Sequence, residues 1–371
     1  MSKINFPELF NIIAEKTARN LELLETTFPR YPHVVRENRW FTSGDEEWEK
    51  LEDGYWTPGF WVGMLWLCYA ITGDERFARA ARKWIAPLEP RSRTTSLHDV
   101  GFLFYPSAVL GYEISGDEEL KNLALTAARS LLNRFQPKLG FLNIHDSLRY
   151  RRTAAIDTMM NLPLLWWAWH ITGDRDFYNA ASAHAENTRR YLIRPDGSTC
   201  HILRFNDADP TPQRIESWQG ASPESCWSRG HAWAVAGYAH AFFYTGENIY
   251  KEIFNTLLNC YLLNVPSDSV PYWDFNSSEI PNTVRDASAA AITAYGILTL
   301  CRKEPNETLH TASTKILHSL TKNYFTPADH PALLKHVCFH KPAGIDIDCS
   351  AIFADFYFLN ALYRLRQLNE K

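Results

Sequence analysis

Two aspartates at the heads of apolar segments are the residues of this chain best placed to do chemistry. Asp157 lies near the start of the apolar, helical-looking run of residues 154–168, and Asp99 precedes a similar run that begins at Val100. Burial is unfavourable for an ionised carboxylate and raises its pKa, so such a group can donate a proton near neutral pH. The alternative is that each aspartate caps a helix, a position that Asp favours. Position alone leaves both interpretations open.

The two aspartates form a candidate site if their segments open on the same side of the molecule. If the helices that follow Asp99 and Asp157 belong to one ring and point the same way, both carboxylates lie at one mouth. Two converging carboxylates are the arrangement that glycoside cleavage uses. Their mutual repulsion raises the pKa of one of them, and we expect the raised pKa to belong to Asp157.

A second group of candidates lies between residues 201 and 233. Arg229 carries a planar guanidinium that matches a substrate carboxylate, with a structural ion pair as the alternative. Trp233 lies four residues later, on the same helical face, and is either a stacking surface for a sugar ring or an ordinary core residue. His201 is a candidate donor to the substrate, although a lone His is more often structural. We interpret Asp286, which follows Arg285, as a cap or as half of a structural Arg–Asp pair, with a substrate contact as the lesser alternative.

The repeated unit of the chain is an inner apolar helix, a tight turn and an outer amphipathic helix. Residues 60–69 are apolar on all sides, as expected of a helix that is buried on most faces, whereas residues 75–84 and 119–135 are amphipathic. Glycine closes each inner helix and an acidic residue follows it, which is a signature of one helix ending and the next beginning. The turns are Thr72-Gly73-Asp74, Ser115-Gly116-Asp117, Thr172-Gly173-Asp174 and Thr245-Gly246-Glu247. Their irregular spacing favours a closed helical toroid with a functional mouth over a regular solenoid.

The other segments complete an all-α prediction. Residues 8–28 predict a first helix, residues 29–59 a loop that contains Pro and Trp, and residues 351–369 a last helix. Residues 197–205 and 270–275 are candidates for short β segments in loops. Strands do not alternate with helices, which argues against a parallel α/β sheet. Without a linker-like stretch, we expect one catalytic domain over residues 1–371.

Composition narrows the partners of the chain. Its 371 residues carry a net charge of −4 and no basic run, so we expect binding neither to nucleic acid nor to a membrane. Thirteen Trp, 17 Tyr and 21 Phe are mainly expected in the core, with a few lining a sugar-binding cleft. Seven scattered Cys without a CxxC pair, and a start without a signal-peptide pattern, favour a reducing, cytoplasmic compartment. We expect no metal, because His145-Asp146 and His336 with His340 lack a third ligand, and no cofactor.

Several motifs together resemble the unsaturated glucuronyl hydrolases of glycoside hydrolase family 88, from near residue 10 to the last helix. The motifs are Trp56-Thr57-Pro58-Gly59-Phe60-Trp61, Leu97-His98-Asp99-Val100-Gly101-Phe102-Leu103, Ile156-Asp157 with Asn161-Leu162-Pro163-Leu164-Leu165, Trp227-Ser228-Arg229-Gly230-His231-Ala232-Trp233, Tyr272-Trp273-Asp274-Phe275 and Arg285-Asp286-Ala287-Ser288-Ala289.

The resemblance implies an (α/α)6 barrel that removes a 4,5-unsaturated glucuronic acid from the non-reducing end of oligosaccharides left by polysaccharide lyases. It implies hydration of the C4=C5 vinyl ether, with Asp157 as the general acid and base and Asp99 assisting. It implies a set of substrate-binding residues: Trp56, His98, His201, Gln219, Arg229 and Trp233. The chain departs from a familiar member at Trp218, His231 and near His145, which leaves the leaving sugar open.

Three alternatives remain beside this interpretation. The related unsaturated rhamnogalacturonyl hydrolases of family 105 share the barrel and both aspartates. Sugar epimerases use the same barrel, and a carbohydrate-binding toroid without turnover is the non-enzymatic alternative. Lys335, His340 and Lys341 precede the last helix and are candidates to meet a sulfate, although we favour solvated loop residues. We expect a monomer or a weak homo-oligomer whose partner is the unsaturated oligosaccharide.

Overall fold

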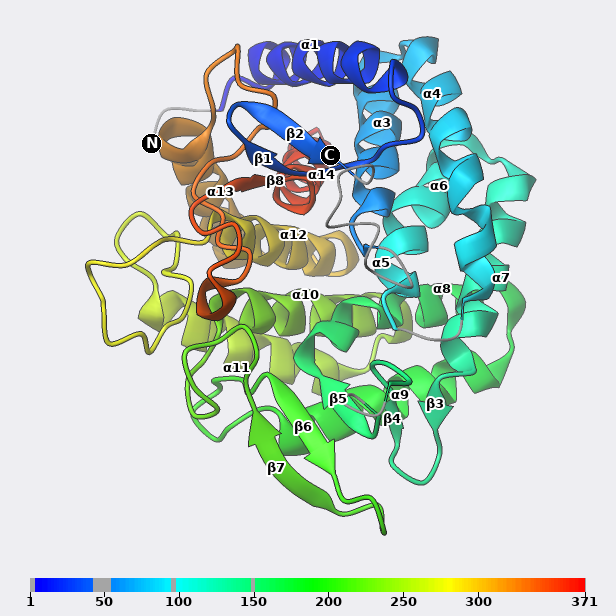
Figure 1. Ribbon diagram of the computed structural model, residues 1–371, viewed down its shortest axis with the longest axis vertical. Coiled ribbons are helices and arrows are strands. Elements are labelled where there is room, and N and C mark those ends of the chain that lie inside the picture. Colours follow the sequence, from blue (N-terminus) through cyan, green and yellow to red (C-terminus); the bar gives the residue numbers. More distant parts are fainter. Residues whose placement is uncertain (1–3, 43–54, 95–97, 148–150, 371) are drawn as a thin grey trace.

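The computed structural model describes residues 4–42, 55–94, 98–147 and 151–370. Within these ranges the helices form two concentric rings (Figure 1). The inner ring consists of α3 (Pro58–Thr72), the continuous stretch of α5 (Val100–Phe104), η2 (Tyr105–Val109) and α6 (Leu110–Ser115), α8 (Leu162–Thr172), α10 (Ser228–Thr245), α12 (Ala287–Lys303) and α14 (Ile352–Asn369). Consecutive members contact each other, and α14 returns to contact α3, which closes the ring.

An outer helix covers each inner one. The outer ring consists of α1 (Phe6–Glu25), α4 (Glu75–Ile85), α7 (Glu118–Leu132), α9 (Arg175–Tyr191), α11 (Asn248–Asn264) and α13 (Glu307–Ser319). The six inner–outer pairs among the described residues make an (α/α)6 barrel, as the family resemblance implied, and so confirm the closed toroid predicted from the turns. The inner helices are apolar all round because they face neighbours on every side; in α12 every residue from Ala287 to Cys301 is buried.

The turns between the rings have the predicted chemistry. Gly73, Gly116, Gly173 and Gly246 end their inner helices in the left-handed region, with φ of 70° to 75°. Glycine adopts this conformation without the strain that a side chain would add. The next residue then caps the outer helix in three cases: Asp74, Asp117 and Asp174 accept hydrogen bonds from backbone N–H groups in the first turns of α4, α7 and α9.

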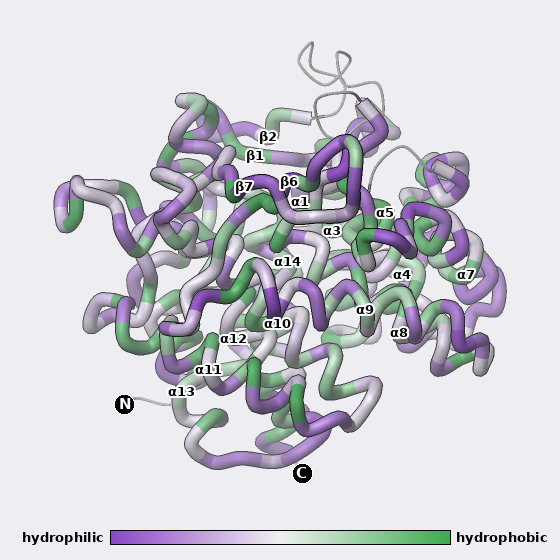
Figure 2. Tube along the Cα trace, turned by 90° about the horizontal axis from the view of Figure 1, so that it is seen from below, coloured by the Kyte–Doolittle hydropathy of each residue, from purple (hydrophilic) through white to green (hydrophobic). Residues whose placement is uncertain are grey.

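Short strands and helical turns lie in the loops. One sheet has the order β2 (Arg39–Thr42), β1 (Pro32–Arg36), β8 (Ser350–Ala351), and a second has the order β5 (Thr153–Ala155), β6 (Ile202–Phe205), β7 (Pro212–Glu216). A small hairpin pairs β3 (Phe135–Gln136) with β4 (Phe141–Leu142). The remaining turns are η1 (Ala86–Arg93), η3 (Ile156–Met160), η4 (Leu320–Tyr324) and η5 (Lys341–Ala343). Figure 2 shows β1, β2, β6 and β7 at one end of the molecule and the C-terminus of the chain at the other.

Three local predictions were wrong. The expected loop after the first helix contains β1 and β2, because the apolar Val34 and Val35 pair with β8 from the far end of the chain; residues 43–54 of that loop lie outside the described residues. Residues 270–275 make isolated bridges rather than a strand. The expected helical run of residues 154–168 begins instead as β5 and the 3-10 turn η3, because residues 153–155 pair with β6.

Candidate active site

Asp99 stands at the start of α5, in the position of a helix cap, but does not cap the helix. Its side chain accepts no hydrogen bond from the first turn. The carboxyl contacts His98 instead, with 3.4 Å between His98 Nε2 and Asp99 Oδ1, and the Asp99 side chain is 25% exposed. The structure therefore contradicts the capping alternative for Asp99. Its motif neighbours Ser96 and Leu97 lie outside the described residues.

Asp157 lies in η3 and caps no helix either. Its Oδ2 is 3.4 Å from Nε2 of His201, and its side chain is 16% exposed. The other ring nitrogen of His201, Nδ1, accepts the backbone N–H groups of Trp218 (3.2 Å) and Gln219 (3.3 Å). Because Nδ1 must be unprotonated to accept these bonds, the proton of neutral His201 is assigned to Nε2 and points to Asp157. The sequence proposed His201 as a substrate donor; the structure makes it a donor to Asp157.

The two carboxyls differ in pKa in the direction opposite to our prediction. Burial raises the pKa of Asp99, and the charge of Asp157 adds to this against the lowering effect of His98, so the pKa lies above its usual value. Burial also acts on Asp157, but the hydrogen bond from His201 and the influence of His201 and His98 outweigh it and lower the pKa of Asp157. The expectation that the raised pKa belongs to Asp157 was therefore wrong, because it ignored the donor His201, which lies directly before β6.

His98 connects the two segments. Its Nδ1 is 2.7 Å from Oγ1 of Thr158, the buried residue that follows Asp157. Burial lowers the pKa of His98. Because Thr158 is reached only after the chain has left α5 and crossed α7, the sequence offered no signal for this contact beyond the position of Thr158 next to Asp157. The structure thus brings His98, Asp99, Asp157 and His201 together.

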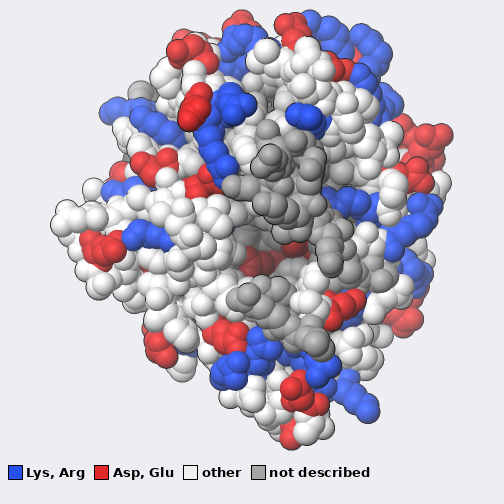
Figure 3. Space-filling model, in the orientation of Figure 1, with Lys and Arg blue, Asp and Glu red and all other residues white. Residues whose placement is uncertain are grey.

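This group opens to solvent at the end of the barrel where α5 and η3 begin, which we call the mouth. Figure 3 shows a hollow near the middle of this face with acidic side chains at its base. The carboxyls of Asp99 and Asp157 are partly exposed, whereas His98 and His201 are buried beneath them. The arrangement leaves two carboxyls accessible to a substrate while their histidine neighbours are shielded from water.

Trp56 and Trp233, the two tryptophans expected to stack on the sugar, differ in their exposure to solvent. Trp56 is partly exposed and packs on Phe339 with nearly parallel rings, 6.5 Å between centroids and 13° between planes. Trp233 is only 1% exposed and lies edge-on to Trp56 at 6.3 Å. The stacking role that the resemblance implied for Trp233 was wrong, and the core alternative holds, because other aromatic rings, among them Phe102 at 5.0 Å, cover it. Trp233 supports Trp56 from behind.

Arg229 is buried beside the mouth and holds several of its residues in place. It is 1% exposed, and its Nη1 pairs with Oδ2 of Asp286 at 3.0 Å. Its Nη2 donates to the backbone oxygen of Phe339 (2.6 Å) and to Oε1 of Gln219 (2.7 Å). These contacts favour the structural alternative that the sequence left open for Arg229. They also fix the oxygen of the Gln219 side-chain amide, so that its NH₂ remains as the group to meet a ligand.

The residues that departed from the family pattern are built into the structure. His231 is buried, with Nε2 2.9 Å from the backbone oxygen of Leu257. Trp218 lies partly exposed beside the site, and its indole N–H donates to Glu216 at 3.3 Å. Among the proposed sulfate contacts, Lys341 forms an ion pair with Glu279 and lies over the ring of Trp273. Lys341 is thus anchored rather than freely solvated.

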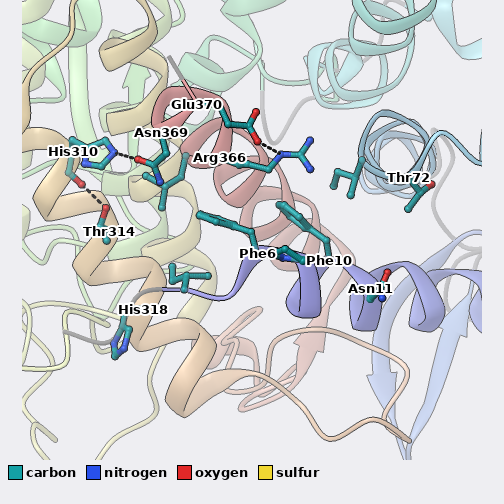
Figure 4. Close-up of a pocket in the computed structure, with 14 residues that line it drawn as sticks. Phe6, Phe10, Asn11, Thr72, His310, Thr314, His318, Arg366, Asn369 and Glu370 are labelled. Atoms are coloured by element: carbon teal, nitrogen blue, oxygen red, sulfur yellow. Dashed lines mark hydrogen bonds and ion pairs between the residues drawn. The ribbon is translucent and has the colours of Figure 1, made fainter.

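A second hollow of about 1060 Å³ lies at the opposite end of the barrel, between α1, α13 and α14 (Figure 4). Two pairs of its polar side chains contact each other: His310 Nε2 is 2.9 Å from Oδ1 of Asn369, and Nε of Arg366 is 3.7 Å from Oε1 of Glu370. Among the described residues that line it, Glu370 is the single carboxylate, so the described lining has no counterpart of the carboxyl pair at the mouth. In the described part of the chain, no three His, Cys, Asp or Glu side chains gather as a metal site would require, and no helix has the length and apolarity to cross a membrane.

Comparison with known proteins identifies the class to which this barrel and its carboxyl pair belong. The model of the family described as Glycosyl Hydrolase Family 88 matches residues 24–363. An unsaturated glucuronyl hydrolase of Bacillus sp. (strain GL1) is 34% identical over 365 residues, which cover 95% of this chain and 94% of that protein. An unsaturated chondroitin disaccharide hydrolase of Streptococcus pneumoniae is 31% identical and covers 86% of this chain and 84% of its own length.

The comparison with solved structures points to the same class of protein as the sequence relatives. The crystal structure of the unsaturated glucuronyl hydrolase from Bacillus sp. GL1 superposes with a TM-score of 0.88 at 32% identity and covers 96% of both chains. The protein is therefore a glycosidase. The chain belongs to glycoside hydrolase family 88.

Proposed function

We propose that this glycosidase removes 4,5-unsaturated glucuronic acid from the non-reducing end of lyase-generated oligosaccharides by hydrating the C4=C5 double bond. The observation that carries the proposal is the pair of partly exposed carboxyls, Asp99 and Asp157, which share one mouth and cap no helix. A carboxyl that is not used as a cap keeps its lone pairs and its proton available for a substrate.

In the proposed reaction Asp157 is both acid and base. Its protonated carboxyl delivers a proton to C4, which leaves an oxocarbenium-like cation shared between C5 and the ring oxygen. The resulting Asp157 carboxylate takes a proton from a water molecule whose oxygen bonds to C5, so one water is added in total. The hemiketal at C5 opens, and the hemiacetal that forms at C1 releases the remaining sugar. Asp99 assists by positioning the substrate and stabilising the developing positive charge.

The pKa of Asp157 is lowered in the free protein, whereas a proton donor must be protonated. The proposed role therefore requires the bound substrate to raise this pKa. A bound uronate brings a second negative charge to the mouth and excludes water, and both effects raise the pKa of a neighbouring carboxyl. The raised pKa of Asp99 supports a second assignment, in which Asp99 donates the proton and Asp157 activates the water. Titrating both carboxyls by ¹³C NMR with a saturated glucuronide bound distinguishes the two, because the donor is the one with the higher pKa in the complex.

The surrounding residues supply binding. The partly exposed ring of Trp56 is placed to stack on the sugar, and the Gln219 side-chain NH₂ to meet an oxygen of the uronate. The relatives are named for unsaturated glucuronyl and unsaturated chondroitin disaccharide substrates. Glycosaminoglycan-type disaccharides are therefore the proposed substrates.

A spectrophotometric assay tests the proposal. The C4=C5 bond conjugated to the carboxylate absorbs in the ultraviolet, and hydration removes this absorbance. We expect loss of absorbance with unsaturated chondroitin or hyaluronan disaccharides and little or none with an unsaturated rhamnogalacturonan disaccharide. The reverse preference would favour a family 105 activity, and absorbance that persists on all three substrates would contradict the proposal.

The unpaired cysteines support a reducing compartment for this activity. All seven are free thiols, and only Cys349 is more than slightly exposed. We infer a cytoplasmic enzyme that acts as a monomer or a weak homo-oligomer. Cell fractionation and analytical ultracentrifugation test these two statements; a periplasmic location or a tight oligomer would contradict them.

A further inference from the structure

The first turn of α5 is capped by a side chain from another part of the chain. An aspartate at the position of Asp99 ordinarily accepts the N–H of the second or third helical residue. Here the N–H of the third residue, Phe102, donates to Oδ1 of Asn161 at 2.9 Å, and Asp99 accepts none. Asn161 therefore does for α5 what Asp99 would otherwise do.

Asn161 is held in one orientation at the junction of the two catalytic segments. It follows η3, which carries Asp157, and precedes α8, and it is completely buried. Because Oδ1 is occupied by Phe102, the amide nitrogen Nδ2 must face the other way. Nδ2 completes no hydrogen bond within the described ranges. The Asn161 amide lies close enough to the Asp99 carboxyl to lower the pKa of that carboxyl.

Gly101 allows the two segments to come this close. A Cβ atom at position 101 would lie 2.5 Å from both Cα and Oδ1 of Asn161, a distance that real Cβ atoms do not show. Any larger residue at Gly101 would push α5 away from Asn161 and separate Phe102 from its acceptor. The contact is thus built from both sides, by a glycine on α5 and an amide beside η3.

We propose that Asn161 is a positioning residue that takes over the capping of α5 and so leaves the Asp99 carboxylate directed to the mouth. The proposal rests on the proposed function in one respect: it assumes that Asp99 takes part in the reaction. The charged and titratable groups that face Asp99 are His98, Asp157 and Arg91, and none of them accepts the Phe102 N–H. Without Asn161, Asp99 is the acceptor available for that N–H, and it turns from the substrate toward its own helix.

Two variants of Asn161 test the proposal. Asn161→Ala removes both acceptor and donor; we expect kcat to fall by about 10²-fold, the usual effect of a misplaced catalytic group. The unfolding midpoint should change little, because Asp99 replaces the lost cap. Asn161→Asp keeps the acceptor and the shape but adds a negative charge in place of the donor. In this variant we expect ¹³C NMR titration to show a higher pKa for Asp99 than in the wild type.

Asn306→Ala is the matched control. Asn306 caps α13 by accepting the N–H of Leu309 at 3.0 Å, the same bond in an outer helix. Its loss should lower the unfolding midpoint and leave kcat unchanged, the opposite of Asn161→Ala. An Asn161→Ala variant that loses stability but keeps wild-type kcat would overturn the proposal.

The NMR arm separates this proposal from the proposed function. An unchanged Asp99 pKa in Asn161→Asp overturns the positioning role, whichever substrate the enzyme uses. This titration remains a valid test even if the Asn161→Ala variant does not fold. If Asp99 responds as expected while the wild-type protein hydrates no unsaturated disaccharide, the proposed function fails and the positioning of Asp99 by Asn161 stands.

Discussion

The start of α12 and the starts of α5 and η3 have the same sequence pattern and opposite structures. Asp286 opens α12, accepts the Ser288 N–H at 3.1 Å, pairs with Arg229 and is completely buried. Asp99 and Asp157 accept no cap hydrogen bond and are partly exposed. An aspartate before an apolar helix is therefore a structural cap where its carboxylate accepts an N–H of its own helix and pairs with a cation. It is available for chemistry where other side chains take over those contacts.

The comparison also explains Arg229. Burial raises the pKa of Asp286, and the Arg229 charge counteracts this, as in other buried ion pairs. Arg229 in turn holds Gln219 and the backbone at Phe339. Asp286, which caps a helix, thus shapes the mouth indirectly through Arg229. Asp99 and Asp157, which cap no helix, lie in the mouth itself.

Asp157→Asn should show the largest effect on the chemical side of this comparison. The change keeps the shape of the side chain and removes the proton that the reaction needs, so we expect kcat to fall by about 10³-fold or more. The thermal unfolding midpoint should stay near that of the wild type, because Asp157 caps nothing. Absorbance loss and calorimetry on the same preparation measure both. Turnover close to the wild type would remove Asp157 from the mechanism.

Asp286→Ala should show the largest effect on the structural side. It leaves the Arg229 guanidinium buried without its carboxylate, which destabilises proteins by about 3–5 kcal/mol. Denaturant unfolding measures this loss. Replacing Asp286 with little change in stability would show that Arg229 is satisfied by its backbone contacts alone.

His201→Ala should reduce the difference in pKa between Asp157 and Asp99. Removing the Nε2–H donor eliminates the main contribution that lowers the pKa of Asp157, while burial, which raises it, remains. The pKa of Asp157 should therefore rise, and a larger fraction of Asp157 should be protonated at neutral pH. NMR titration of the Asp157 carboxyl carbon measures the shift; a lower or unchanged pKa would contradict the tautomer assigned to His201.

Asp174→Ala should show the smallest effect and is the reference for an ordinary cap. Asp174 accepts the N–H of Asp176 at the start of the outer helix α9 and also contacts Arg129. We expect a loss of about 1 kcal/mol in the free energy of unfolding and no change in kcat. A change in kcat would mean that the outer ring is coupled to the mouth.

The barrel was predictable because its signals are local. The Gly73 and Gly173 turns, the Asp caps and the all-round apolar inner helices each depend on neighbours within a few residues. Asp99 and Asp157 were found by the same pattern, and so was Asp286. The pattern could not tell the cap from the two free carboxyls, because the deciding partners lie far away in the sequence.

The amino-acid sequence by itself determined the ring of helices and the presence of carboxyls at their heads, since helix ends and apolar faces follow from side-chain type and spacing. Only the tertiary structure decided which carboxyls are free and which has the higher pKa. His201 reaches Asp157 from the position directly before β6, Asn161 caps the helix that Asp99 begins, and Arg229 neutralises Asp286. A pKa depends on charges and donors within a few ångströms in space, and folding brings these together from distant parts of the chain.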